Sequence, residues 1–200
     1  MRLMIAVPTT DYVHADFLKS LVDLQARLIR DGVDVTVRIM SGTLVYIARN
    51  RIALEAIEKG HTHVLWLDSD MVFGDGILDD LMFCGKDFVC GAFVSRRPQY
   101  RPCVYETLKP LEKVKRIGTE PFKVEGCGFA CVLTAVGVLK DVQEKYGTTF
   151  RPTEDFGEDL AFCERAIAAG HEIWCEPTVR PGHIAHIPVY AGEEESHFGL

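Results

Sequence analysis

The sequence lacks the segments that mark a membrane, secreted or repetitive protein. No apolar run approaches the roughly 20 residues that span a bilayer. The apolar run near the N-terminus, RLMIAVP, is too short for a secretion signal. No repeat, low-complexity tract or domain linker interrupts the 200 residues. These absences predict a cytoplasmic protein with one domain over residues 1–190 and a polar tail over residues 191–200.

Paired cysteines and an excess of positive charge are also missing. The seven cysteines are scattered and none forms a CxxC pair, which argues against zinc-ribbon and thioredoxin-type sites and favours small buried thiols. The net charge of −7 argues against a polyanion that binds the whole surface. A nucleic acid is therefore not favoured as a partner, although the charge is compatible with a local basic site.

What the sequence does contain is an alternation of strand-like and helix-like segments. Short apolar or β-branched runs predict strands, and apolar residues at helical spacing predict the helices between them. The predicted strands are 2–8, 33–40, 61–68, 87–94, 126–134 and 171–177, and the predicted helices are 14–32, 44–60, 76–85 (capped by Asp75), 135–147 and 157–170. This order is typical of an α/β fold, with a mostly parallel sheet flanked by helices on both faces.

The segment between residues 95 and 126 breaks this alternation. It contains several prolines, many basic residues and only short β-like pieces, so we expect a small β excursion or hairpin at the edge of the sheet. Its first part, SRRPQYRP, holds Arg96, Arg97 and Arg101. These arginines either approach an anionic substrate or form a solvated loop, and the sequence leaves both readings open.

Two aspartates follow directly after a predicted core strand. In VLWLDSDMVF, Asp68 and Asp70 flank Ser69 at the carboxyl end of the strand. Ligands of open parallel sheets bind at such ends, and Mg²⁺ or Mn²⁺ takes one or two carboxylates together with water and substrate phosphates. The alternative is a turn in which the aspartates bond nearby backbone amides.

Two later segments offer further polar candidates. Glu158 and Asp159 open a predicted helix, where the helix dipole favours acidic residues, yet a carboxylate there could also accept a proton from a hydroxyl. His183 follows the last predicted strand in a loop with proline and glycine. A lone histidine is more often structural, so the sequence alone leaves its role open.

Taken together, three segments resemble nucleotide-sugar glycosyltransferases of the GT-A fold, especially those of glycosyltransferase family two. The segments are ARNRIALEAIEKGHTHVLWLDSDMVF, GCGFACVLTAVGVLKDV and EDFGEDLAFCERAIAAGHEIWCEPTVRPGHI, and they occur in the order of the family. The resemblance extends over residues 3–186. It implies a GT-A fold and transfer of a sugar from a nucleoside-diphosphate sugar to a hydroxyl-bearing acceptor.

The resemblance also implies roles for the matching residues on the donor side. Asp70 would bind Mn²⁺ or Mg²⁺, Asp68 would face the ribose or the water shell of the metal, and His183 would contact the metal or the diphosphate. The residues implied to contact the donor are Pro8, Thr9, Arg49, Asp68, Ser69 and Asp70.

On the acceptor side, the resemblance implies that Asp159 is the base, with Glu158 as its neighbour, in a reaction that inverts the configuration of the sugar. The segment implied to form part of the acceptor site consists of Gly126, Cys127, Gly128 and Phe129.

The sequence also departs from the family pattern. The segment VRIMSGT lacks the acidic residue that often reads the nucleotide base, and no QxxRW motif follows the helix that begins at Glu158. Two other functions are alternatives to the transferase. A nucleotidyltransferase would need a Gly-rich basic loop after the first strand, and VPTTDYVHADF has neither glycine nor lysine. An inactive sugar- or nucleotide-binding module of the same fold is the other alternative.

Overall fold

A seven-stranded sheet forms the centre of the computed structural model, which describes residues 1–96 and 99–185. The β1–β2, β1–β3 and β5–β11 pairs are parallel, and β10 and β8 run antiparallel to their neighbours. The order is β2 (Asp34–Met40), β1 (Arg2–Pro8), β3 (His63–Leu67), β10 (Cys131–Ala135), β5 (Phe88–Gly91), β11 (Ile173–Glu176) and β8 (Phe122–Val124). The predicted α/β fold is confirmed. The predicted tail (191–200) and Arg97 lie outside the described residues.

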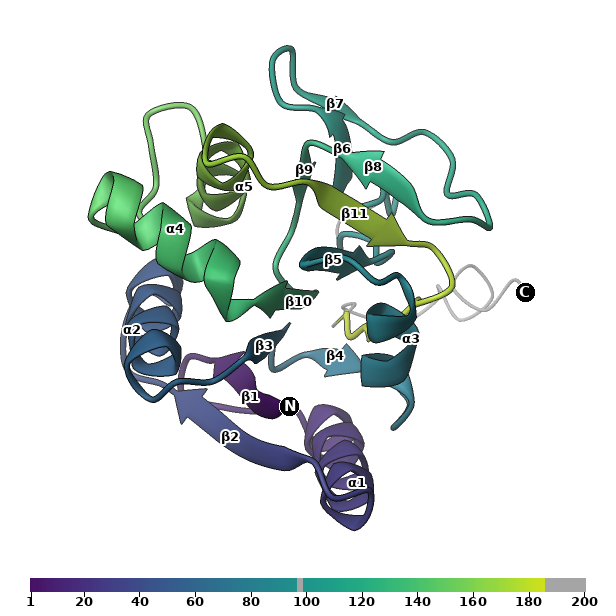
Figure 1. Ribbon diagram of the computed structural model, residues 1–200. Helices are drawn as coiled ribbons and strands as arrows, with labels where there is room; N and C mark the ends of the chain where they lie inside the picture. The colour runs from purple at the N-terminus through teal and green to yellow at the C-terminus, as the bar shows by residue number, and fades with distance from the viewer. Residues whose placement is uncertain (97–98, 186–200) are drawn as a thin grey trace, which may run out of the picture.

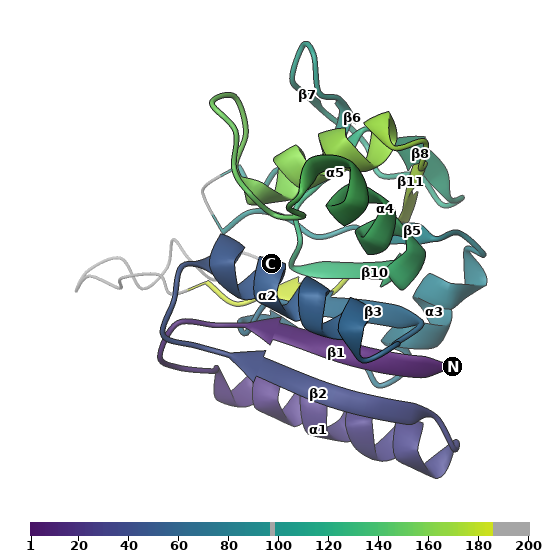
Figure 2. The same cartoon turned by 60° about the vertical axis from the view of Figure 1, so that its left-hand side comes forward.

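Helices cover both faces of this sheet, as predicted (Figure 1). The helices are α1 (Ala15–Arg30) and α3 (Ile77–Phe83) on one face, and α2 (Val45–Glu58), α4 (Val136–Tyr146) and α5 (Glu158–Ala168) on the other (Figure 2). In α1, Phe17, Leu21, Leu24 and Leu28 recur at helical spacing and are buried against the sheet. None of the helices of the described chain is long and apolar enough to cross a membrane.

An aromatic cluster fills the core beneath α2, α4 and α5. The Phe150 and Phe162 rings stack with centroids 4.5 Å apart, and the Phe129 ring meets that of Phe162 edge-on at 5.4 Å. Trp66 of β3 packs against Phe150 at 5.0 Å and donates its indole N–H to the Thr134 hydroxyl. Each such ring pair stabilises the fold by about 0.5–1.5 kcal/mol beyond its buried area. The cluster therefore fixes α5 against the central strand β3.

The predicted β excursion is confirmed at the β8 edge of the sheet. It contributes β8 to the main sheet and forms a separate three-stranded sheet from β6 (Val104–Thr107), β7 (Glu112–Lys113) and β9 (Gly126–Cys127). The single strand predicted over 126–134 is wrong, because β9 pairs with β6 whereas β10 joins the main sheet. The chain changes sheets at Gly128, whose N–H donates to the Cys103 carbonyl.

The start of α3 differs from the prediction, whereas the state of the cysteines agrees with it. The Asp75 cap of α3 is wrong, since the helix starts after Gly76 without a side-chain cap, and the Asp75 carbonyl instead accepts a hydrogen bond from Arg27. The cysteines of the described chain are unpaired, and five are buried thiols as predicted, while Cys84 and Cys103 are partly exposed.

Candidate active site

The candidate site lies where β1 and β3 end side by side. These strands are parallel neighbours, so Thr9, which follows β1, comes close to Ser69, which follows β3. The two hydroxyl oxygens are 3.0 Å apart, and the Thr9 hydroxyl also donates to the Tyr12 carbonyl. The His14 amide donates to the Ser69 carbonyl. The structure thus brings the predicted donor-side residues of two strands together, with Pro8 buried at the end of β1.

A two-stranded sheet places His183 beside Asp70. β4 (Met71–Val72) pairs with β12 (Gly182–His183), and the Ile184 amide donates to the Asp70 carbonyl. His183 Nε2 lies 3.5 Å from Asp70 Oδ2, and its Nδ1 lies 2.8 Å from the Val94 carbonyl oxygen. Because a carbonyl can only accept, Nδ1 carries a proton and Nε2 is the nitrogen directed toward Asp70.

The charges around Asp70 favour its ionised form. Burial alone would raise the pKa of Asp70, but the hydrogen bond to His183 and the positive charges of His183 and Arg96 outweigh burial and lower it. Arg96 Nη1 lies 2.8 Å from Asp70 Oδ2. The same hydrogen bond to Asp70 raises the pKa of His183, against the opposing effect of burial.

Asp70 and His183 have the chemistry of an open divalent-cation site. Metal-binding histidines commonly donate the second ring N–H to a backbone carbonyl, as His183 does to Val94. Mg²⁺ and Mn²⁺ need few protein ligands when water and phosphates complete the shell. In residues 1–96 and 99–185, no three His, Cys, Asp or Glu side chains are grouped to hold a metal by themselves. The pair therefore fits a cation that shares its shell with a substrate.

Asp68 is directed to a different partner, the guanidinium of Arg49. Arg49 Nη2 lies 2.7 Å from Asp68 Oδ1, and Arg49 Nη1 lies 2.5 Å from Glu158 Oε1. The Arg49 side chain is only 4% exposed and its guanidinium lies over the Phe129 ring at 5.6 Å. Burial raises the pKa of Asp68, and the charge of Arg49 opposes that rise. Arg49 therefore joins α2 to the end of β3 and the start of α5.

Asp159 and Glu158 are adjacent in sequence but make different contacts. The Asp159 Oδ1 accepts the Leu160 amide at 2.8 Å, whereas Glu158 is held by Arg49. Burial raises the pKa of Asp159, and the Leu160 amide partly offsets this effect. A carboxylate with a raised pKa at a partly buried position suits a proton acceptor.

The segment implied to bind the acceptor is buried. The Cys127 carbonyl accepts a weak hydrogen bond from the Cys163 thiol, and Phe129 belongs to the aromatic cluster. A side chain at Gly126 would meet Leu108 at 2.8 Å and one at Gly128 would meet Phe93 at 3.0 Å. The side chains of this segment thus pack in the core, and its acceptor role stays a prediction.

Asn50 holds the loop that leads to α5, a role that the sequence pattern did not predict. Its Oδ1 accepts hydrogen bonds from the Thr148 hydroxyl, the Thr149 amide and hydroxyl, and the Phe150 amide, at 2.8–3.4 Å. These bonds anchor the loop that leads to α5. The only signal in the sequence was that Asn50 follows Arg49 in the segment ARN.

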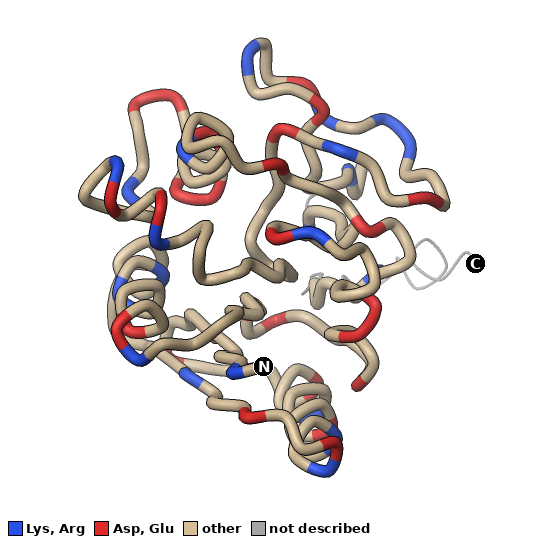
Figure 3. The backbone as a smooth tube through the Cα atoms, viewed as in Figure 1, with Lys and Arg blue, Asp and Glu red and all other residues tan. Residues whose placement is uncertain are grey.

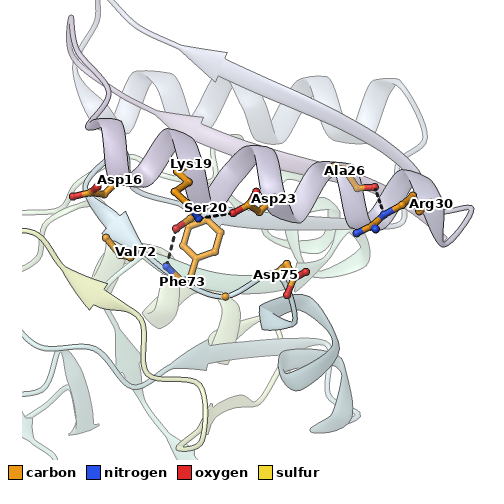
Figure 4. Close-up of a pocket in the computed structure, with 10 residues that line it drawn as sticks. Asp16, Lys19, Ser20, Asp23, Ala26, Arg30, Val72, Phe73 and Asp75 are labelled. Carbon is orange, nitrogen blue, oxygen red and sulfur yellow. Dashed lines mark hydrogen bonds and ion pairs between the residues drawn. The ribbon is translucent and has the colours of Figure 1, made fainter.

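A large surface cavity lies outside this constellation. It has a volume of about 800 Å³ between α1 and the segment after β4 (Figure 4). Its lining consists of Asp16, Lys19, Ser20, Asp23, Ala26, Arg30, Val72, Phe73, Gly74 and Asp75. Lys19 pairs with Asp23, and the Ser20 hydroxyl accepts the Phe73 amide. The side chains that line this cavity do not converge on a common point as Asp70 and His183 do. We therefore assign the site to the strand ends.

Acidic and basic residues are interspersed over the described chain (Figure 3). In the view of Figure 3, no large face formed by the described residues carries charges of one sign, so the charged residues of the site form a local group. In the site, Arg49 pairs with Asp68 and Glu158, and Arg96 pairs with Asp70.

Comparisons with known proteins agree with this architecture. No family model matches the sequence, and no curated protein sequence matches it significantly. The crystal structure of A197 from STIV is similar with a TM-score of 0.62 and 20% identity, over 93% of this chain and 87% of that chain. The crystal structure of GalNAc-T7 with UDP, GalNAc and Mn²⁺ is similar with a TM-score of 0.57 and 10% identity, over 96% of this chain and 44% of that chain. In fold, the chain is GT-A-like and resembles glycosyltransferases.

Proposed function

We propose that the protein is a metal-dependent glycosyltransferase that moves a sugar from a nucleoside-diphosphate sugar to an acceptor hydroxyl with inversion. The observation that supports this best is the convergence of Asp70 and His183 beside the ends of β1 and β3. In open α/β sheets such strand ends are where ligands bind. GalNAc-T7, which has a similar fold, is described with UDP, GalNAc and Mn²⁺.

Asp70 and His183 would hold Mn²⁺ or Mg²⁺, with Asp68 at the ribose or at the water shell of the cation. When bound, the cation would neutralise the charge that develops on the departing diphosphate. Thr9 and Ser69, whose hydroxyls meet between the two strand ends, would line the nucleotide pocket together with Pro8. Arg96, which contacts Asp70, would have to release it when the cation binds.

Asp159 would accept the proton of the acceptor hydroxyl. For an inverting reaction this proton acceptor must stand on the side of the sugar opposite to the diphosphate, and Asp159 comes from α5 whereas the donor-side residues follow β1 and β3. The segment from Gly126 to Phe129 would border the acceptor site from beneath, because all four of its residues are buried.

The proposal is tested by transfer assays with a panel of nucleotide sugars. With Mn²⁺ present, we expect release of a nucleoside diphosphate, and NMR of the product should show an inverted anomeric centre. Asp159→Asn should lower turnover and leave donor binding nearly unchanged. Asp70→Ala should reduce the increase in transfer rate that Mn²⁺ produces. A protein that binds nucleotides without turnover would instead be the inactive module, and release of pyrophosphate would indicate a nucleotidyltransferase. The cytoplasmic location stays a prediction.

A further inference from the structure

We infer that Glu158 is a positioning residue, which acts through Arg49 to keep the Asp68 carboxylate available to the donor, and that it is not the proton acceptor. This inference rests on the proposed function, because it assigns Glu158 a task in donor binding.

Asp68 and Glu158 share the guanidinium of Arg49. One Nη group of Arg49 contacts Asp68 Oδ1 at 2.7 Å, and the other contacts Glu158 Oε1 at 2.5 Å. The guanidinium is planar, and its donors form a rigid fork that can bind one carboxylate through two parallel bonds. Because Glu158 takes one arm of the fork, Asp68 is bound by the other arm through Oδ1, and its Oδ2 lies outside that bond.

The Arg49 guanidinium is buried, which makes its partners hard to replace. Arg49 is only 4% exposed, and its Nε is buried without a hydrogen-bond partner among the described residues. Water therefore cannot readily replace a lost carboxylate, and a buried donor left without a partner is costly. If Glu158 were absent, the free Nη would turn to the remaining carboxylate. A two-bonded contact with Asp68 would then engage the oxygen that the ribose or the water shell of the cation would use.

Glu158 and Asp159 differ in the groups that hold them. Glu158 Oε1 accepts from the charged guanidinium of Arg49, so protonation of Glu158 would remove one charge of this buried ion pair. Asp159 differs, because its Oδ1 accepts from a neutral backbone amide, a contact that does not depend on an opposite charge. The two carboxylates thus have separate roles. Glu158 acts on the donor side, and Asp159 acts on the acceptor hydroxyl.

Glu158→Gln and Glu158→Leu test this division. The binding of UDP, GDP, ADP, CDP and dTDP with Mn²⁺ would be measured by calorimetry, and the nucleotide that binds the wild type best would serve as the probe. We expect Glu158→Leu to weaken binding of that probe about tenfold or more. Glu158→Gln should weaken it less, because the amide oxygen still accepts from Arg49. In transfer assays, the donor KM should rise while kcat changes little.

Glu55→Gln is a matched control. Glu55 also pairs with an arginine, at 2.7 Å from Arg38, and is about as exposed as Glu158, at 20% against 17%. It should change probe affinity less than twofold. Equal kcat losses in both Glu158 variants, with unchanged probe affinity, would identify Glu158 as the base and overturn the inference. A wild type that binds none of the nucleotides would refute the proposed function and the positioning role together.

Discussion

Arg49→Met gives the strongest test of how the site is held together. The substitution removes a guanidinium that is 4% exposed and that joins the end of β3 to the start of α5. Two carboxylates, 31% and 17% exposed, would lose their shared partner. Breaking a fully buried pair costs about 3–5 kcal/mol. Because both carboxylates keep some access to water, we expect the lower end, about 3 kcal/mol of unfolding free energy.

Arg38→Met provides the comparison on the same face of the molecule. Arg38 is 39% exposed and pairs with Glu55 at 2.7 Å. An exposed pair of this kind contributes about 0.2–1 kcal/mol. In urea titrations, the unfolding free energies of the two variants should therefore differ by about 2 kcal/mol. The dependence of the unfolding free energy on urea should be the same in both. In a thermal scan, Arg49→Met should lower Tm by about 6–12 °C. Equal losses in the two variants would show that the Arg49 contacts are no stronger than surface ion pairs.

Four further perturbations test other parts of the structure. Asn50→Ala removes the acceptor of four hydrogen bonds and should lower the unfolding free energy by about 1–3 kcal/mol in urea titrations. Gly126→Ala places a Cβ within 3.0 Å of two leucine side chains and should lower the unfolding free energy by about 1–3 kcal/mol. Gly137→Ala in α4, where a Cβ meets nothing within 4 Å, should stabilise by about 0.5–1 kcal/mol. Without metal, His183→Gln should lower the unfolding free energy by up to about 1 kcal/mol. The effect should be largest at pH values between the unfolded pKa of Asp70 and the unfolded pKa of His183.

The sign of the His183 effect follows from both partners. A histidine whose folded pKa is raised stabilises the fold fully below its unfolded pKa, and this contribution is lost as the pH rises through the folded value. The lowered pKa of Asp70 adds stability above its unfolded pKa, which is lost as the pH falls through the folded value. Unfolding free energies of wild type and His183→Gln should therefore converge at high pH. A difference that grew with pH would contradict the assigned charge states.

The sequence was informative where local pattern determines structure. Apolar spacing in α1 and β-branched residues in β2 predicted both elements within a few residues. The helix buries one face through that spacing, whereas in the edge strand β2 Val35 and Val37 pack partly buried against the core. Pattern failed at Gly126 to Ala135, since apolar continuity does not reveal that the chain leaves one sheet and enters another. The Asp75 cap failed for a related reason, because the turn at Gly76 shifts the helix start by one residue.

The candidate site shows the same division between local and distant information. Asp68 and Asp70 could be placed at a strand end from their neighbours alone, because a core strand stops there. The partners of Arg49 could not be predicted in this way, since Glu158 is 109 residues away in sequence and meets Arg49 only through helix packing. Asn50 was missed for this reason as well, as its four donors come from a loop about 100 residues further along.

The most direct test of the central claim is metal-dependent nucleotide binding by the wild type and by Asp70→Ala. A nucleoside diphosphate at 100 times its Kd stabilises the folded state by about 2.7 kcal/mol, which corresponds to a Tm increase of about 5–11 °C for a chain of this size. We predict this increase for the wild type with Mn²⁺, little or none after chelation, and little or none for Asp70→Ala under either condition. Equal Tm increases with and without Mn²⁺, or an Asp70→Ala protein that responds like the wild type, would contradict the account.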